Sequence, residues 1–280
     1  NSLFRNDGNF NFSNIINDSI VNSTGYHACT GWGDYDNDGD LDMFVTQAYR
    51  TPNSPMLNRL YQNQLMETGN ARFERITSGD IVNDPGYSYG FAWGDWDGDG
   101  DLDLFTARTY NESENNSAFI NNGNNNKWIE IKLTGTPTNR SAIGTKVRVR
   151  TIINGSPVWL LRTVEGQSGY CGQNLDLHFG LGNAAIIDTI KVEWLSGAIE
   201  NYTGINVNQV IRIVEGTGII GINQNGTEIP EGFRLYQNYP NPFNPETKIK
   251  FDIPVNSTGE NSIVKLTVFN ISGQEVAVLL

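Results

Sequence analysis

The 280-residue chain has little of the chemistry that enzymes and nucleic-acid-binding proteins need. It contains two cysteines and two histidines, and 31 acidic residues outnumber 19 basic ones, which gives a net charge of −12. So few cysteines exclude a disulfide framework, and the acidic balance argues against nucleic acid as a partner, because that partner needs a basic surface. No apolar run is long enough to cross a bilayer, so we expect no transmembrane segment.

The scarce cysteines and histidines are also isolated from one another. Cys29 and Cys171 fall in different predicted domains, and a pair of small buried thiols is favoured over a disulfide. His27 and His178 lack the neighbouring serine, cysteine or carboxylate pattern of a nucleophilic triad. His178 lies in an apolar stretch, Leu177-His-Phe-Gly, where we expect a packed core histidine. We therefore predict that this chain is not an enzyme.

What the sequence has in abundance is aspartate, gathered in two loops 61 residues apart. The first loop reads Asp34-Tyr-Asp36-Asn-Asp38-Gly39-Asp40-Leu41-Asp42 and the second reads Asp95-Trp-Asp97-Gly-Asp99-Gly100-Asp101-Leu102-Asp103. Outside these loops the chain has 21 acidic and 19 basic residues, so most of the net charge is local. Five carboxylates in nine residues repel one another unless a cation lies among them.

The spacing of these aspartates is that of a calcium loop, which places oxygen ligands at alternate positions and a glycine at the sixth. Gly39 and Gly100 permit the sharp turn. The twelfth position, where a helix–loop–helix site has glutamate, holds Val45 and Thr106, so the ninth residue is expected to close each site. We predict two calcium sites with ligands from Asp34, Asp36, Asp38, Asp40, Asp42, Asp95, Asp97, Asp99, Asp101 and Asp103.

Other interpretations of the loops are weaker. Magnesium keeps several waters and seldom uses so dense a protein cage. Acidic turns without an ion are disfavoured because both copies keep the full spacing. No histidine, cysteine or other catalytic partner recurs beside the loops, so the two predicted ions are structural.

The repeat extends beyond the aspartates. Trp32-Gly33-Asp34 recurs as Trp93-Gly94-Asp95, and each loop is followed by a short run that reads as a strand. A second element occurs three times, as Leu3-Phe-Arg-Asn-Asp-Gly8, Leu60-Tyr-Gln-Asn63 and Ala118-Phe-Ile-Asn-Asn-Gly123. Repeats of this length, with short strands and Gly/Asn turns, indicate stacked β units.

These motifs resemble the FG-GAP/VCBS repeat of calcium-binding β-propellers, including those of integrin α-subunits. The resemblance covers residues 1–126 and implies about two propeller blades, each with an ion in a loop between strands. Propellers typically have four to eight blades. Because Asn1 already lies inside a repeat, the resemblance implies that upstream blades are missing.

Residues 127–216 have a different character, with strands that alternate apolar and charged side chains. Asn139-Arg-Ser-Ala-Ile-Gly144, His178-Phe-Gly-Leu-Gly182 and Val192-Glu-Trp194 resemble the ASPIC/UnbV domain, which commonly follows such blades. Leu195 departs from the proline that this family usually has. We expect an antiparallel sandwich or barrel here.

Several basic residues lie on or beside these predicted strands. One interpretation is a surface for anions or acidic glycans, and the favoured one is a solvated strand face. The residues are Arg140, Lys146, Arg148, Arg150 and Arg162.

The C-terminal part divides into a predicted linker, residues 217–231, and a last domain, residues 232–280. The domain contains Tyr239-Pro-Asn-Pro-Phe-Asn-Pro245 and Asn270-Ile-Ser-Gly-Gln-Glu-Val276. These strings closely resemble the C-terminal sorting domain (type A) of the type IX secretion system of Bacteroidota, here truncated. The resemblance implies the type IX machinery as a partner and a secreted, extracellular or outer cell-surface location.

Taken together, the sequence predicts an all-β protein: a partial β-propeller, a β-sandwich or barrel-like ASPIC/UnbV domain, and a truncated small β-sandwich. The expected function is calcium-stabilised binding or adhesion to an extracellular protein or glycan. One alternative is an accessory, non-catalytic part of a larger secreted hydrolase or lyase whose catalytic domain lies upstream. A purely structural spacer is another.

Overall fold

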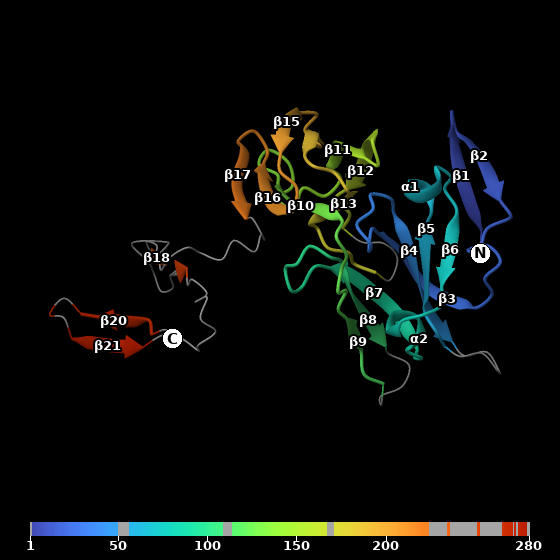
Figure 1. Cartoon of the computed structure of the whole chain (residues 1–280), viewed down its shortest axis with the longest axis horizontal. Helices are drawn as coiled ribbons and strands as arrows, with labels where there is room; N and C mark the ends of the chain where they lie inside the picture. Colours follow the sequence, from blue (N-terminus) through green and yellow to red (C-terminus); the bar gives the residue numbers. More distant parts are fainter. Residues whose placement is uncertain are drawn as a thin grey trace. The chain divides into compact units, whose positions relative to one another are not determined.

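The computed structural model describes residues 2–49, 56–108, 114–166 and 171–223, with short C-terminal stretches at 234–235, 251–252, 265–270, 272 and 274–278. The chain divides into two compact units, residues 1–226 and 227–280 (Figure 1). Both units are built from strands, which confirms the predicted all-β class. Within the described part of the chain, the helices are two single turns, α1 (Leu65–Thr68) and α2 (Asp80–Asn83).

The two copies of the repeat form two antiparallel sheets. The first repeat sheet has the order β3-β4-β5-β6, with strands β3 (Tyr26–Gly33), β4 (Asp42–Tyr49), β5 (Arg59–Asn63) and β6 (Phe73–Ile76). The second repeat sheet has the order β7-β8-β9, with strands β7 (Ser88–Gly94), β8 (Asp103–Arg108) and β9 (Ser117–Phe119).

The strand pairing repeats at the same 61-residue offset as the sequence. Trp32 lies opposite Met43 in the first repeat sheet, and Trp93 lies opposite Leu104 in the second. The two sheets pack face to face through β3, β4 and β7, with Phe44, Phe91 and Trp93 in edge-to-face contact. Neither sheet buries its apolar side alone, as expected of stacked β units.

A separate hairpin precedes the first repeat sheet. It consists of β1 (Leu3–Gly8) and β2 (Asn11–Ile15), which pair antiparallel. β1 carries the first copy of the second repeated element, Leu3–Gly8, and β5 contains its second copy, Leu60–Asn63.

The described residues of 127–166 and 171–223 form a sandwich of two four-stranded sheets. One sheet has the order β13-β10-β16-β17, with β10 (Lys127–Thr134), β13 (Leu177–Gly182), β16 (Gln209–Val214) and β17 (Gly218–Asn223). The other has the order β12-β11-β14-β15, with β11 (Lys146–Ile153), β12 (Ser156–Thr163), β14 (Ile187–Glu193) and β15 (Ile199–Ile205). Within the described residues the sheets do not close into a barrel.

The alternating side chains of these strands make the sandwich core. Every second residue of β11 is buried, so that one face of the strand packs inward, as a half-buried strand should. Ile129 and Ile131 of β10 meet Val147 and Val149 of β11 in this core, and all four are fully buried.

Two expectations about the sandwich are wrong. It is not purely antiparallel, because β10 and β16 pair in parallel. The intervening strands β11–β15 supply the long crossover that a parallel pair requires. The predicted linker 217–231 also begins too early, since β17 pairs antiparallel with β16 and adds an edge strand. The sequence of β17 is rich in Gly and Ile and lacks the alternation of apolar and charged residues that predicts a half-buried strand.

The preference for free thiols is also wrong, because Cys29 and Cys171 form a disulfide. Cys29 lies on β3, and Cys171 lies just before β13, in the segment that runs back from the sandwich to the repeat sheets. Their Cα atoms are 6.5 Å apart, within the range for a disulfide. Both cysteines are buried in the core between the repeat sheets, with Phe44 and Phe91.

The second unit is described in part. It contains β18 (Arg234–Leu235) paired with β19 (Phe251–Asp252), and β20 (Thr267–Phe269) paired with β21 (Glu275–Val278). The turn of the second hairpin is held by the Asn270 carboxamide oxygen, which accepts hydrogen bonds from the backbone N–H groups of Ser272 and Gln274. The Tyr239–Pro245 string lies outside the described residues.

Candidate metal centre

The two aspartate clusters occupy equivalent loops. The first acidic loop (Asp34–Asp42) joins β3 to β4, and the second acidic loop (Asp95–Asp103) joins β7 to β8. In both loops the fourth and sixth residues have positive φ: Asn37 and Gly39 in the first, Gly98 and Gly100 in the second. Glycine, and to a lesser degree asparagine, tolerates this conformation. The tight turn therefore follows directly from the residues at these two positions.

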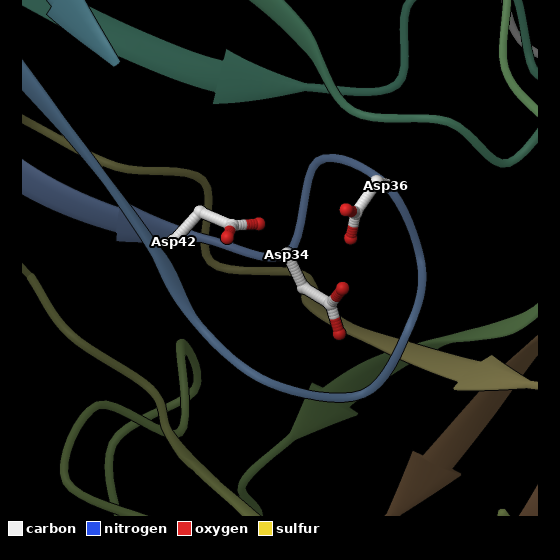
Figure 2. Close-up of side chains that lie close together, drawn as sticks. All are labelled: Asp34, Asp36 and Asp42. Carbon is white, nitrogen blue, oxygen red and sulfur yellow. The ribbon is translucent and has the colours of Figure 1, made fainter. Parts of the chain in front are cut away.

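In the first acidic loop the structure brings together two groups of three carboxylates. Asp34, Asp36 and Asp42 each place an oxygen within 4.8 Å of the others, and Figure 2 shows the three side chains gathered within the turn. Asp36 and Asp38 form a second such group with Glu67 of α1. Asp36 belongs to both groups.

Glu67 was not predicted from the sequence. It lies 25 positions after Asp42 and outside the nine-residue spacing, and only the packing of α1 against the loop brings it near. It supplies a glutamate to a loop that lacks one at the twelfth position. A single acidic residue in a short polar stretch gives no signal that would have revealed this role.

In the second acidic loop the carboxylates of Asp95, Asp97 and Asp99 form a corresponding group, within the same 4.8 Å. Asp97 and Asp99 are exposed, whereas most of the first loop is buried or half-buried. Asp101 and Asp103 lie outside this group, as Asp40 lies outside the groups of the first loop.

The ninth aspartate of each loop is held by the asparagine of the second repeated element, Asn63 in one copy and Asn121 in the next. The Asn63 backbone N–H donates to Asp42 Oδ1 at 2.8 Å, and the Asn121 backbone N–H donates to Asp103 Oδ1 at 2.8 Å. The side-chain amide of each asparagine donates to the carbonyl of the leucine before that aspartate. The second sequence element therefore positions the closing carboxylate of the first.

The negative charge of the first loop's carboxylates is poorly balanced by hydrogen-bond donors among the described residues. One oxygen each of Asp36, Asp38 and Asp40 is buried and has no hydrogen-bond partner among the described residues. Burial raises the pKa of Asp42 to about 10, and the charges of Asp36 and Asp34 add to this shift. Burial also raises the pKa of Asp34 to about 7, although the Arg162 guanidinium beside it acts in the opposite direction. Buried carboxylates whose oxygens lack partners are stabilised either by protonation or by a bound cation.

In the second loop burial also raises the pKa values of three carboxylates, but by less. Burial raises the pKa of Asp95 and of Asp99, and raises that of Asp101 to about 6. The residues of both loops fit a calcium ion, since each offers several carboxylate oxygens at the alternate positions that calcium uses. Glu67 adds a further oxygen at the first loop.

The first acidic loop also contacts the sandwich directly. Asp34 Oδ2 accepts hydrogen bonds from the Gly180 backbone N–H at 3.0 Å and from Arg162 Nη2 at 3.3 Å. Arg162 packs over the ring of Phe179 and is largely buried. The interpretation of Arg162 as part of a solvated strand face is therefore wrong. Because β12 lies near the first acidic loop, the Arg162 side chain points toward Asp34 and away from solvent.

Asn37, at the tip of the same loop, bonds both to the second acidic loop and to β13 of the sandwich. Its amide Nδ2 donates to the Gly100 carbonyl and to Asp101 Oδ1 of the second loop. Its Oδ1 lies 2.6 Å from His178 Nε2, and its carbonyl accepts the Gly182 N–H at 2.8 Å. His178 is buried, as predicted, but it packs against a loop tip rather than only within the sandwich core.

This contact allows a test. A Cβ at Gly180 would collide with the Asn37 backbone, so Gly180→Ala should push the sandwich away from the first acidic loop. Overpacking of this kind costs about 1–3 kcal/mol, or roughly 3–10 °C in melting temperature. Gly172→Ala is the control, because a Cβ there meets open space. Equal melting temperatures for the two variants in calorimetry would show that the contact is not formed.

The comparison with protein families identifies one domain. The family described as ASPIC and UnbV matches residues 135–220, which confirms the predicted ASPIC/UnbV domain and extends it into β17. In the described part of the chain, no helix is long and apolar enough to cross a membrane.

Similar proteins share more than this domain. The chain is 32% identical over 186 residues to human cartilage acidic protein 1, an alignment that covers 65% of this chain and 27% of the relative. The mouse protein of the same name is 31% identical over 186 residues, covering 65% and 28%. The Xenopus tropicalis protein is 32% identical over 169 residues, covering 59% and 25%. The matched region thus spans about a quarter of these relatives, and it is longer than the ASPIC and UnbV match.

Proposed function

We propose that this chain is a calcium-stabilised, non-catalytic binding module that works outside the cell. The observation that carries the proposal is the pair of equivalent acidic loops, each of which gathers three carboxylates within 4.8 Å. The buried oxygens of Asp36, Asp38 and Asp40 without hydrogen-bond partners in the described residues support a bound cation. Calcium is favoured because the ligands are many, are hard oxygens and occupy the alternate positions of a calcium loop.

The proposed ions have a structural role. The first acidic loop lies where both repeat sheets and the sandwich meet, through Asp34 and Asn37. An ion that holds this loop in one conformation would also hold the surfaces that the loop contacts. The chemistry that calcium supplies here is charge neutralisation and cross-linking of carboxylates.

An extracellular location is supported by one feature of the first unit, the Cys29–Cys171 disulfide, which suits an oxidising compartment. For the proposed calcium sites we expect the weak affinity of extracellular modules, of the order of 10⁻⁴–10⁻³ M. The relatives named cartilage acidic protein 1 are consistent with such a setting. For residues 232–280 we propose export by the type IX secretion machinery, on the strength of the sequence strings given above.

The binding role is favoured over an accessory role beside a distant catalytic domain because a cleft lies at the junction of the repeat sheets and the sandwich. The cleft is lined by two tryptophans and several polar side chains, features typical of ligand sites. The proposed partner is an extracellular protein or glycan.

Calcium titration calorimetry on the full chain tests the metal part of the proposal. We expect two calcium ions per chain. Asp36→Ala removes the residue shared by both groups of the first loop, and Asp97→Ala removes its equivalent in the second, so each variant should bind one ion. Asp188→Asn, an acidic residue of β14 outside both loops, should still bind two. No heat of binding from the wild-type chain would reject the proposed sites.

A screen of the calcium-loaded chain against immobilised glycans and matrix proteins tests the binding role. We expect at least one partner that is lost when calcium is removed. A chain that takes up two calcium ions but binds nothing in the screen would favour the accessory or spacer interpretation.

A further inference from the structure

The outer face of one sandwich sheet carries a row of basic residues. The sheet has the order β12-β11-β14-β15, and its other face packs in the sandwich core. Lys146, Arg148 and Arg150 alternate with buried residues along β11, so their side chains lie on the outer face. Lys191 of β14 lies opposite Arg148 and extends this basic face by a fourth residue. We infer that the basic face binds a linear sulfated polysaccharide, an inference that rests on the extracellular binding role proposed above and names its partner class.

The first argument is the balance of charge on this face. The strands place six residues directly opposite the three β11 cations: Trp159, Leu161 and Thr163 of β12, and Thr189, Lys191 and Glu193 of β14. Glu193 is the single acidic residue among them. The face is therefore basic, although the chain has a net charge of −12. Such a local excess of positive charge attracts an anionic partner.

Most of this positive charge is available to a ligand. Glu193 pairs with Arg148 Nε at 3.3 Å and with Lys191 Nζ at 2.7 Å. This pairing fixes the Arg148 guanidinium and leaves its two Nη groups without a hydrogen bond to the described residues. Lys146 and Arg150 are exposed, and neither forms an ion pair within the part of the chain that the structure describes. These nitrogens can therefore donate charge-assisted hydrogen bonds to sulfate oxygens.

Two carboxylates outside these opposite positions mark the ends of the basic face. At one end, Asp188 adjoins the β14 partner of Arg150. At the other end, Glu165 lies two residues past the β12 partner of Lys146. Among the described residues, neither carboxylate forms an ion pair with the basic face. They confine the binding of anions to the row itself, which spans about 14 Å.

The second argument is the spacing of the cations. Residues on one face of a strand are about 7 Å apart along it, and opposite residues on adjacent strands are about 5 Å apart. The three β11 cations and Lys191 therefore form a straight and dense set of charges. A linear polymer with several anionic groups in each repeat unit matches this set better than a polymer with a single carboxylate per repeat unit. Sulfated polysaccharides have this charge density.

The third argument is an exposed tryptophan beside the cations. Trp159 lies directly opposite Arg150 and is 53% exposed. An indole on a sheet face offers a flat apolar surface for the C–H face of a sugar ring, and tryptophan and arginine are among the residues that contribute most at binding surfaces. A sulfated polysaccharide supplies both the ring and the anions.

Other polyanions fit this face less well. An extended acidic peptide binds at a free sheet edge, through main-chain hydrogen bonds, rather than across the side chains of a sheet face. Nucleic acid also needs a basic surface, but the proposed location of the chain is outside the cell. Both polymers serve as comparison ligands in the test.

Titration calorimetry of the calcium-loaded full chain with heparin fragments tests the inference. We expect binding at about 0.05 M salt and its loss at about 0.5 M salt, because salt screens exposed charges. Hyaluronan fragments, with a single carboxylate per repeat unit, should bind more weakly, and neutral dextran should not bind. Oligothymidylate and polyglutamate of similar length should also bind more weakly than heparin.

Variants of exposed residues locate the binding surface. Lys146→Ala combined with Arg150→Ala removes two exposed cations and should weaken heparin binding about tenfold. Trp159→Ala should weaken it about threefold, and Trp159→Phe should weaken it less. Arg212→Ala is the matched control and should bind as the wild type does, because Arg212 is an exposed cation on β16 of the other sheet. Each variant should melt within about 2 °C of the wild type, since every replaced residue is exposed.

The inference is overturned if heparin fragments do not bind, if any comparison ligand binds as tightly, or if the Lys146, Arg150 double variant and Arg212→Ala behave alike. Calcium uptake is measured on the same samples. Normal uptake without heparin binding rejects the basic face alone, whereas absent uptake rejects the proposed calcium function.

Discussion

Removing calcium with a chelator is expected to lower the melting temperature of the chain by about 10 °C. Sites with dissociation constants of about 10⁻⁴–10⁻³ M at about 10 mM free calcium stabilise the folded state by roughly 1.4–2.7 kcal/mol each. Two sites give roughly 3–5 kcal/mol, and about 2–4 °C per kcal/mol applies to domains of this size. Differential scanning calorimetry with and without chelator measures the change.

The first acidic loop should account for the larger part of this loss. Its carboxylates are more deeply buried than those of the second loop, and Asp36, Asp38 and Asp40 keep buried oxygens without partners within the described residues. Asp36→Ala should therefore reduce the response to the chelator more than Asp97→Ala does. Magnesium at the same concentration should restore less stability than calcium. A chelator-independent melting temperature would contradict the structural role of the ions.

Loss of the Cys29–Cys171 disulfide is expected to have an effect of similar size. The bond closes a loop of 142 residues, and the chain-entropy relation gives about 5 kcal/mol for a loop of that length. The bond also joins β3 of the first repeat sheet to the segment that enters β13 of the sandwich. Its reduction should lower the melting temperature by roughly 10 °C or more.

Reduction by dithiothreitol, followed by calorimetry under reducing conditions, measures this effect. The double variant Cys29→Ala, Cys171→Ala should melt near the reduced wild-type protein and should not respond to the reductant. Both cysteines are buried in the core between the repeat sheets, so the protein is reduced in denaturant and refolded under reducing conditions. A response of the wild type below 2 °C would then show that the two thiols do not pair in solution.

The two interventions should also interact. The first acidic loop and the disulfide connect β3 and its neighbours to the same stretch of the sandwich. The loop bonds to β13 through Asp34 and the Gly180 N–H, and the disulfide joins Cys29 to Cys171 in the segment before β13. Sites that share a structural connection are not additive. Chelation should therefore cost more stability in the reduced protein than in the oxidised one.

The local sequence was sufficient to predict the turns of the acidic loops and much of the strand pattern. Gly39 and Gly100 need positive φ, and alternation along Lys146–Ile153 makes one buried face, so these features follow from neighbours a few residues away. The 61-residue offset of the sequence repeat also relates the strand pairs, since Trp32 pairs with Met43 and Trp93 pairs with Leu104. The parallel pairing of β10 with β16 did not follow in this way, because pairing direction depends on the path of the intervening chain.

The sequence by itself therefore determined the all-β class, the turn of each acidic loop and the ASPIC/UnbV domain, because backbone preference, alternation and motif spacing are short-range properties. Only the tertiary structure decided what surrounds those loops. Glu67, Arg162 and His178 reach the first loop, and Cys171 reaches Cys29, from positions far along the chain. Such contacts depend on how sheets pack against one another, which no local pattern encodes.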